Sequence, residues 1–198
     1  GVQGSPNVVG ALNEQSPVTT QFLPTLTPTA GQAAMLVGGE ILSAELTYDP
    51  PFGHPTSTEM TIDHYYALDF APEHAVGHLN IASTSGSYSP DIVYAPRAAD
   101  FTGWASAAAI FLAKAGETPS VVQSVEAVHS GGTITLTLPA PPQPGSVIVA
   151  FITERNQWND PLPLNPTGWN INTKISTIAT PGPIQRHARL MWYGGCAG

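Results

Sequence analysis

The stretch GWASAAAIFLAKA, residues 103–115, decides between an all-β fold and a fold that contains helices. Alanine is the best helix former, so the composition of this stretch favours a helix. Its boundaries favour a strand, because Gly103 opens it, Gly116 follows it, and residues 109–112 are an unbroken apolar run of strand length. We predict a strand over 105–113, with a helix as the alternative.

Glycine and proline interrupt the rest of the chain. The 198 residues include 19 glycines and 20 prolines, which leave few windows long enough for a helix. The segments between them are rich in Val, Ile, Thr, Tyr and Phe and are predicted as strands: 18–26, 34–46, 59–70, 78–83, 91–95, 133–138, 147–153, 169–177 and 188–193. Short strands joined by Pro/Gly turns are typical of an antiparallel sandwich or barrel.

The segment GSVIVAFITER, residues 145–155, is apolar on both faces. A strand of that kind is covered on both sides, so we predict that residues 147–152 form a central core strand. Residues 28–41 and 142–155 share an order of Pro, Gly, small polar residue and apolar run. We therefore consider a weak internal duplication whose two halves complete one sandwich, since neither half has enough strands for a closed core.

The first 17 residues are rich in Gly, Asn, Ser and Pro around a short apolar centre. We predict that residues 1–17 are an extended N-terminal arm and that residues 18–198 are a single β-sandwich domain. Val8, Val9 and Leu12 are expected to dock the arm on a neighbouring subunit, gaining affinity as it orders. The alternative is a floppy terminus.

The charge of the chain excludes several classes of partner. Six Lys and Arg face fourteen Asp and Glu, for a net charge of −8, and only 10% of the residues are charged. Nucleic-acid binding and attachment to anionic membranes need a basic surface, so neither is expected. No signal-peptide pattern or long apolar run occurs, so we expect synthesis in the cytoplasm without membrane insertion. So little charge suits a protein packed against neighbours, and a secreted domain with a neutral surface is the alternative.

Two motifs invite a metal or acid–base interpretation. In EHAVGH, residues 73–78, His74 and His78 have the spacing of a helical zinc pair, but Ala75 stands where Glu is needed, and Pro72 and Gly77 disfavour a helix. We therefore expect no metal and no other cofactor. In IDHYYALDF, residues 62–70, strand alternation predicts that Asp63 and His64 point to opposite faces.

The remaining chemistry-bearing residues form no specific pattern. Asp69 could pair with Glu40, Glu45 or Glu59 for glycoside hydrolysis, but no spacing selects one pair. The chain has no Gly-x-Ser-x-Gly and no phosphate-binding glycine loop. Cys196 is the only cysteine, so no intrachain disulfide forms, and we expect an unreactive, partly exposed thiol. No catalytic residues are predicted.

Trp158 is the best candidate for a binding residue. In RNQWNDP, residues 155–161, it is surrounded by Arg155, Asn156 and Asn159, whose side chains can hydrogen-bond sugar hydroxyls. These four residues are a possible contact for a glycan or a protein partner. Trp104 and Trp192 border apolar strands and are predicted to be core residues.

The order of these motifs resembles a module found in phage structural and tail-associated proteins. The resemblance lies in TLTLPAPPQPGSVIVAFITER (135–155) leading to NPTGW (165–169), and in DFTGWASAAAIFLAKAG (100–116). It implies a jelly-roll-like β-sandwich without catalytic residues, displayed on a virion as a capsid decoration, head-spike component or small tail accessory. In the N-terminal half, HPTSTEMTIDHYY (54–66) replaces the expected Gly-Trp turn, which leaves the duplication open.

The resemblance also carries expectations about partners. Other virion proteins, either capsid or tail subunits, are the expected partners, in a homo-oligomer or bound to a lattice, and a host surface glycan would serve attachment. The alternative functions are a carbohydrate-binding module or adhesin and, third, a glycan-degrading enzyme.

Overall fold

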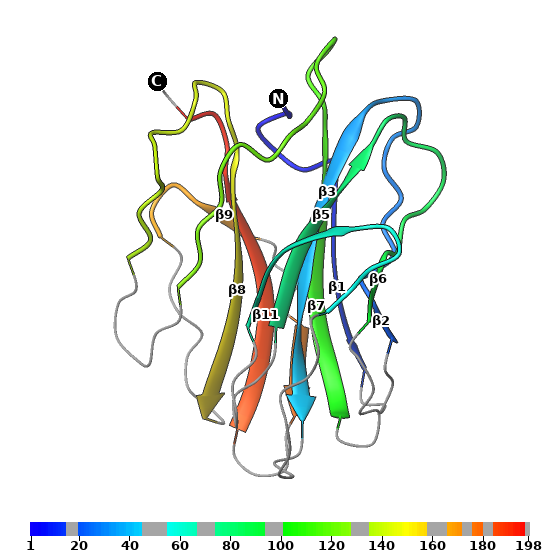
Figure 1. Ribbon diagram of the computed structural model, residues 1–198, viewed down its shortest axis with the longest axis vertical. Helices are drawn as coiled ribbons and strands as arrows, with labels where there is room; N and C mark the ends of the chain where they lie inside the picture. The colour runs from blue at the N-terminus through cyan, green and yellow to red at the C-terminus, as the bar shows by residue number, and fades with distance from the viewer. Residues whose placement is uncertain are drawn as a thin grey trace.

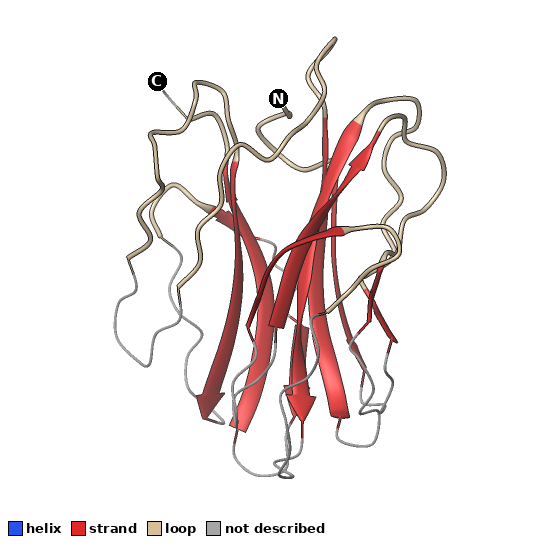
Figure 2. Ribbon diagram, in the orientation of Figure 1, coloured by secondary structure: helices blue, strands red, loops and turns tan. Residues whose placement is uncertain are grey.

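The computed structural model describes residues 1–14, 20–44, 55–66, 74–93, 101–127, 135–157, 166–171, 176–179 and 184–196. This part of the chain forms antiparallel strands and contains no helix (Figure 2). The all-β prediction is therefore confirmed. Residues 103–112 of GWASAAAIFLAKA belong to the strand Phe101–Leu112 and not to a helix.

The described strands form three sheets. The largest has five strands in the order β1 (Val8–Glu14), β7 (Phe101–Leu112), β3 (Ala34–Ala44), β5 (His74–Ile81) and β4 (Thr61–Tyr66). In the second, β11 (Ile184–Tyr193) pairs with β8 (Ile148–Gln157) on one side and with β10 (Ser176–Ala179) and β9 (Asn170–Ile171) on the other. The third, called the ribbon below, pairs β2 (Thr20–Phe22) with β6 (Asp91–Val93).

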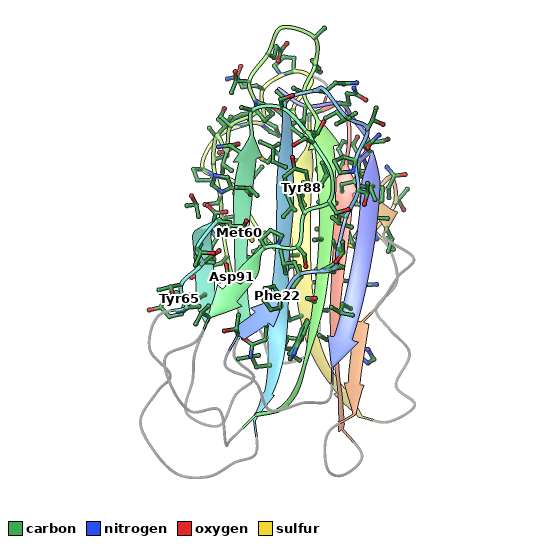
Figure 3. All side chains as sticks on the ribbon, turned by 90° about the vertical axis from the view of Figure 1, so that its right-hand side faces the viewer. Phe22, Met60, Tyr65, Tyr88 and Asp91 are labelled. Carbon is green, nitrogen blue, oxygen red and sulfur yellow. The ribbon has the colours of Figure 1, made fainter. Side chains whose placement is uncertain are left out.

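The five-stranded sheet lies between the other two (Figures 1 and 3). Toward the second sheet, Phe111 of β7 packs against Leu190 and Trp192 of β11, with ring centroids of Phe111 and Trp192 6.5 Å apart. Toward the ribbon, Ile110 joins the cluster that contains Leu23. This double burial explains the absence of polar alternation along β7, where consecutive residues face two different cores.

The prediction that residues 147–152 form a central strand is wrong. Within the described residues β8 pairs only with β11 and stands at the edge of its sheet. Its residues 148–153 are half-buried. An apolar run indicates that both faces of a strand are covered. It does not indicate with how many neighbouring strands that strand pairs. The central, doubly covered strands of the fold are β7 and β3.

Glycines on β3 let both outer layers approach closely. A Cβ atom on Gly38 would lie 2.7 Å from Leu23 Cδ1, below the ribbon, and one on Gly39 would lie 2.9 Å from Phe151 Cε1 of β8. Small residues continue the Gly38 position across the sheet, in one row of four strands made of Gly10, Ala108, Gly38 and Gly77. We call these four residues the small-residue row.

The N-terminal residues belong to the main sheet, so residues 8–14 are not an arm outside the sandwich, whereas docking on a neighbouring subunit stays a prediction. β1 pairs with β7 of the same chain from Val8↔Ile110 to Glu14↔Trp104. Val8 packs against the ribbon-side core and Val9 against the second core, whereas Leu12 is exposed. The apolar centre of this segment covers the edge of the buried strand β7, which is why it folds back on its own chain. Residues 15–17 and the predicted boundary at 17/18 lie outside the described residues.

Two further expectations need correction. Residues 135–138 of the predicted strand 133–138 lie in no strand, and 133–134 fall outside the described residues. Cys196 is buried rather than partly exposed. Its backbone N–H donates to Ser146 O (3.2 Å) and its carbonyl accepts from Gly145 N–H (2.9 Å), which fixes the C-terminal end beside the start of β8.

Candidate functional site

Histidines and carboxylates gather on one face of β4 and β5. His74 and His78 lie on the same side of β5 as Val76, the partner of Gly39 in β3. Since the Cβ position of Gly39 meets Phe151 of β8, this face is the one that looks toward the second sheet. We call Asp63, His64, His74, His78 and Glu126 the acid–histidine cluster.

A β-bulge places Asp63 in this cluster. The pairing of β4 with β5 shifts register between Ile62 and His64, so strict alternation breaks at Asp63. The two carboxylate oxygens of Asp63 lie 3.0 and 2.9 Å from Nδ1 of His78. The prediction that Asp63 and His64 point to opposite faces is therefore wrong, because it assumed a regular strand.

Two contacts tie this cluster to other elements. Nδ1 of His64 lies 3.3 Å from Oε2 of Glu126, which belongs to the segment that follows β7. Nδ1 of His74 lies 3.4 Å from the hydroxyl of Thr153 on β8. Burial lowers the pKa of His74, and the negative charge of Glu126 opposes that shift in part. The cluster thus connects β4 and β5 to β8 and to the segment that contains Glu126.

The geometry of the cluster does not resemble a metal centre. His74 and His78 are four residues apart along a strand, which separates them by about 13 Å at the usual rise per residue. Within the part of the chain that the structure describes, no three His, Cys, Asp or Glu side chains are placed to hold a metal ion. The Asp63–His78 pair holds the imidazole in one orientation. Glu73, the remaining residue of the motif, lies outside the described residues.

The two described carboxylates among those considered for glycoside hydrolysis, Glu40 and Glu59, are not brought into one open site. Glu40 is fully buried on the ribbon side of β3, opposite Ser106 on β7, whereas Glu59 is exposed. A glycosidase needs two carboxylates that face the same substrate. Asp69 and Glu45 lie outside the described residues.

Asp91 has a structural role on the ribbon, where Figure 3 labels it beside Phe22. One of its oxygens accepts hydrogen bonds from the backbone N–H of Thr58 (3.0 Å) and from the hydroxyls of Thr58 (2.9 Å) and Ser57 (3.1 Å). Burial by itself would raise the pKa of Asp91, but these hydrogen bonds together lower it. They anchor the segment before β4 to the ribbon.

The predicted glycan contact falls largely outside the described residues, which exclude Trp158 and Asn159. Arg155 and Asn156 belong to β8, where their backbones pair with Arg186 and Gln185 of β11. The structure thus places two of the four residues at one end of the second sheet. It leaves the contact itself a prediction.

An aromatic pair that the sequence analysis did not single out lies on the second sheet. Trp169 ends a turn in which its N–H donates to Pro166 O (3.1 Å), with Gly168 at φ +86°. The pairing Met191↔Ile171 and Trp192↔Asn170 then places Trp169 opposite Tyr193. Their ring centroids are 6.1 Å apart and the ring planes are tilted by 53°.

The sequence signal for half of this pair was present. Pro-Thr-Gly-Trp has glycine at the third position, as a type II turn requires, and this predicts that a tryptophan leaves the turn. Its partner could not be found in the same way, because Tyr193 meets Trp169 only through the register of β9 and β11.

The comparisons with known proteins identify no relative. No family model, no curated protein and no solved structure matches this chain. In the described residues, no helix has the length and apolar character to cross a membrane.

Proposed function

We propose that the protein is a non-enzymatic structural protein of a phage-like virion, with a jelly-roll-like sandwich bound to the particle surface. The single observation that carries this proposal is an exposed apolar element outside the sheets. It consists of residues 119–127 and 135–142, which we call the apolar flap.

The two segments of the flap are held together by one side chain. Gln123 donates from Nε2 to Ala140 O (2.8 Å) and accepts at Oε1 from Ala140 N–H (3.0 Å). The flap exposes 42% of Val121, 72% of Val122 and 49% of Leu136. Its one charged residue, Glu126, is paired with His64. The two segments of the flap are therefore tied together, and together they expose three large apolar side chains.

Such an element is stabilised by a neighbour that covers it. Burial of apolar surface contributes about 25 cal/mol per Å², so covering several valine and leucine side chains favours association. The chain has few charges to keep copies or partners apart, since only 10% of its residues are charged. Capsid or tail subunits, or further copies of this chain, would cover the flap. A decoration protein, a head-spike component and a small tail accessory all fit this arrangement.

Immunogold electron microscopy tests the proposal. Antibodies raised against the recombinant protein are applied to virus particles purified from a culture that produces this chain. We expect gold on the particle surface. Labelling confined to soluble protein, with bare particles, would show that the proposal is wrong.

A matched pair of variants tests the flap itself. Val122→Asp should lower the occupancy of particles, because it places a charge in the contact, whereas Ser124→Asp adds the same charge two residues away at an exposed polar position. Occupancy is measured by quantitative mass spectrometry of purified particles. Equal occupancy for the two variants would remove the flap from the contact.

A further inference from the structure

The Trp169–Tyr193 pair has the features of a ligand platform. Tyr193 is 37% exposed and Trp169 is half-buried, so both rings reach the surface. Trp169 directly precedes β9 and Tyr193 ends β11, and the pairing of β9 with β11 brings the two rings side by side at the second sheet. Along β11 the same face carries Met191, which is buried, so the exposed aromatic surface ends at this pair.

The turn before Trp169 holds the pair in a fixed arrangement. Gly168 has the left-handed conformation, which side chains rarely adopt. A Cβ atom at this position would lie 3.2 Å from Cε2 of Tyr193, so the turn itself packs on that ring. Trp169 is also fixed by β9, whose two residues pair with β11 immediately after the turn. A rigid platform loses little conformational entropy when a ligand binds.

The two segments that carry the pair are uncharged. Residues 166–171 and 191–196 contain no Asp, Glu, Lys or Arg. Thr167, two residues before Trp169, is exposed, which provides a hydroxyl group in the turn that leads to Trp169. Within these described segments an anionic ligand would find no cation, and a cationic ligand would find no carboxylate. The platform therefore suits a neutral ligand with a flat apolar face and several hydroxyl groups.

We propose that Trp169 and Tyr193 form a binding site for a neutral glycan. The C–H face of a pyranose ring stacks on an aromatic ring, while its equatorial hydroxyls point sideways to polar groups such as the hydroxyl of Thr167. The two rings are tilted by 53°, so they do not form one flat surface. This arrangement suits two consecutive sugars of a twisted chain, with one sugar on each ring, rather than a single sugar that lies across both rings. This site shares no residue with the predicted contact at Trp158. It does not depend on the proposed virion function.

Isothermal titration with the intact protein tests the site. The probes are neutral hexasaccharides of β-1,4-glucose, β-1,3-glucose, α-1,4-glucose, α-mannose and β-1,4-N-acetylglucosamine. We expect at least one to bind with saturation in the micromolar to millimolar range. Trp169→Ala and Tyr193→Ala should each weaken that binding by roughly tenfold or more, the usual consequence of removing an aromatic anchor.

Phe22→Ala is the matched control, because Phe22 is an exposed aromatic residue on the opposite side of the sandwich, 49% exposed on β2. It should leave glycan affinity unchanged. Thermal melts verify that each variant is folded, and Trp169→Phe, which keeps a ring, should retain part of the affinity.

Three outcomes would overturn the proposal. The first is that none of the hexasaccharides saturates the protein. The second is that binding survives both alanine substitutions, which would place the sugar elsewhere, as at Trp158. The third is that a proline-rich peptide binds through the pair and the sugars do not. Gold labelling of particles is unaffected by these results, so failure of the glycan site and failure of the virion function are distinguishable.

Discussion

Replacing Gly38 with alanine should destabilise the sandwich through steric crowding between two layers. The added Cβ atom would lie 2.7 Å from Leu23 Cδ1, 2.7 Å from Ala108 Cβ and 3.1 Å from the carbonyl oxygen of Ala107. Carbon atoms in good packing contact are about 3.5–4.0 Å apart. Leu23 Cδ1 and Ala108 Cβ would therefore each have to move away from the new Cβ atom by roughly 1 Å. The end of Leu23 can rotate away, but Ala108 Cβ is fixed to the backbone of β7.

The loss of stability expected for Gly38→Ala depends on the fact that Leu23 can move away whereas Ala108 Cβ cannot. Overpacking of a close-packed core costs about 1–3 kcal/mol, and the contact with fixed atoms of β7 places Gly38→Ala in the upper part, about 2–3 kcal/mol. In a chain of this length 1 kcal/mol shifts the melting temperature by about 2–4 °C. We therefore expect Gly38→Ala to melt about 4–12 °C below the wild type.

Thermal unfolding followed by circular dichroism measures this shift. Gly4→Ala is the control, because its nearest neighbours would be 3.7 Å or more from the new Cβ atom, an ordinary contact distance. That variant should melt within about 2 °C of the wild type, since surface changes usually stay within ±0.5 kcal/mol.

A double-mutant cycle with Leu23→Ala isolates the contact. Leu23→Ala alone should cost about 2–5 kcal/mol, and the double variant should cost less than the sum because the methyl at position 38 fills part of the cavity. Additive effects, or a melting temperature for Gly38→Ala equal to that of Gly4→Ala, would refute the argument that Leu23 packs into the space above Gly38.

The remaining predictions concern pH, the thiol and metal ions. Burial lowers the pKa of His74, and burial together with the charge of Arg189 lowers the pKa of His187, so the unfolded chain binds more protons below about pH 6.5. The melting temperature should therefore fall between pH 7.5 and pH 5, and a rise on acidification would contradict this. Cys196 is buried, so Ellman's reagent should react with it much faster in guanidinium chloride than in the native protein, and equal rates would show that the thiol is open. EDTA should leave the melting temperature unchanged, because His74 and His78 are too far apart along β5 to share an ion; a large drop that Zn²⁺ restores would disprove it.

Some of the fold could be predicted from local sequence because it depends on local chemistry. β7 follows from an apolar run of strand length, even though its alanines favour a helix, but the strand begins at Phe101 and so includes Gly103. The edge position of β8 does not follow from GSVIVAFITER. Both β7 and β8 are apolar on two faces, and the number of paired neighbours is decided by strands far away in the chain.

The candidate sites show the same limit. Asp63 contacts His78 through a bulge, and one extra residue in a strand leaves no reliable mark in the sequence. Trp169 could be found from its turn, whereas Tyr193 requires knowledge of the strand register. Val8 was recognised as an apolar residue that needs a partner, but the partner proved to be β7 of the same chain.

The small-residue row also solves a problem of alignment during folding. Alternation of polar and apolar side chains selects the face of a strand, yet a slip by two residues preserves every face. If β3 slipped by two residues against the ribbon, Leu36 or Glu40 would replace Gly38 beneath Leu23, where even one methyl group is crowded. The missing side chains of Gly10 and Gly38 accept the ribbon and the residues that follow β2 in one alignment, whereas hydrophobic pattern alone would tolerate several. At Gly77 the missing side chain makes room for the backbone of Thr61 on β4 instead.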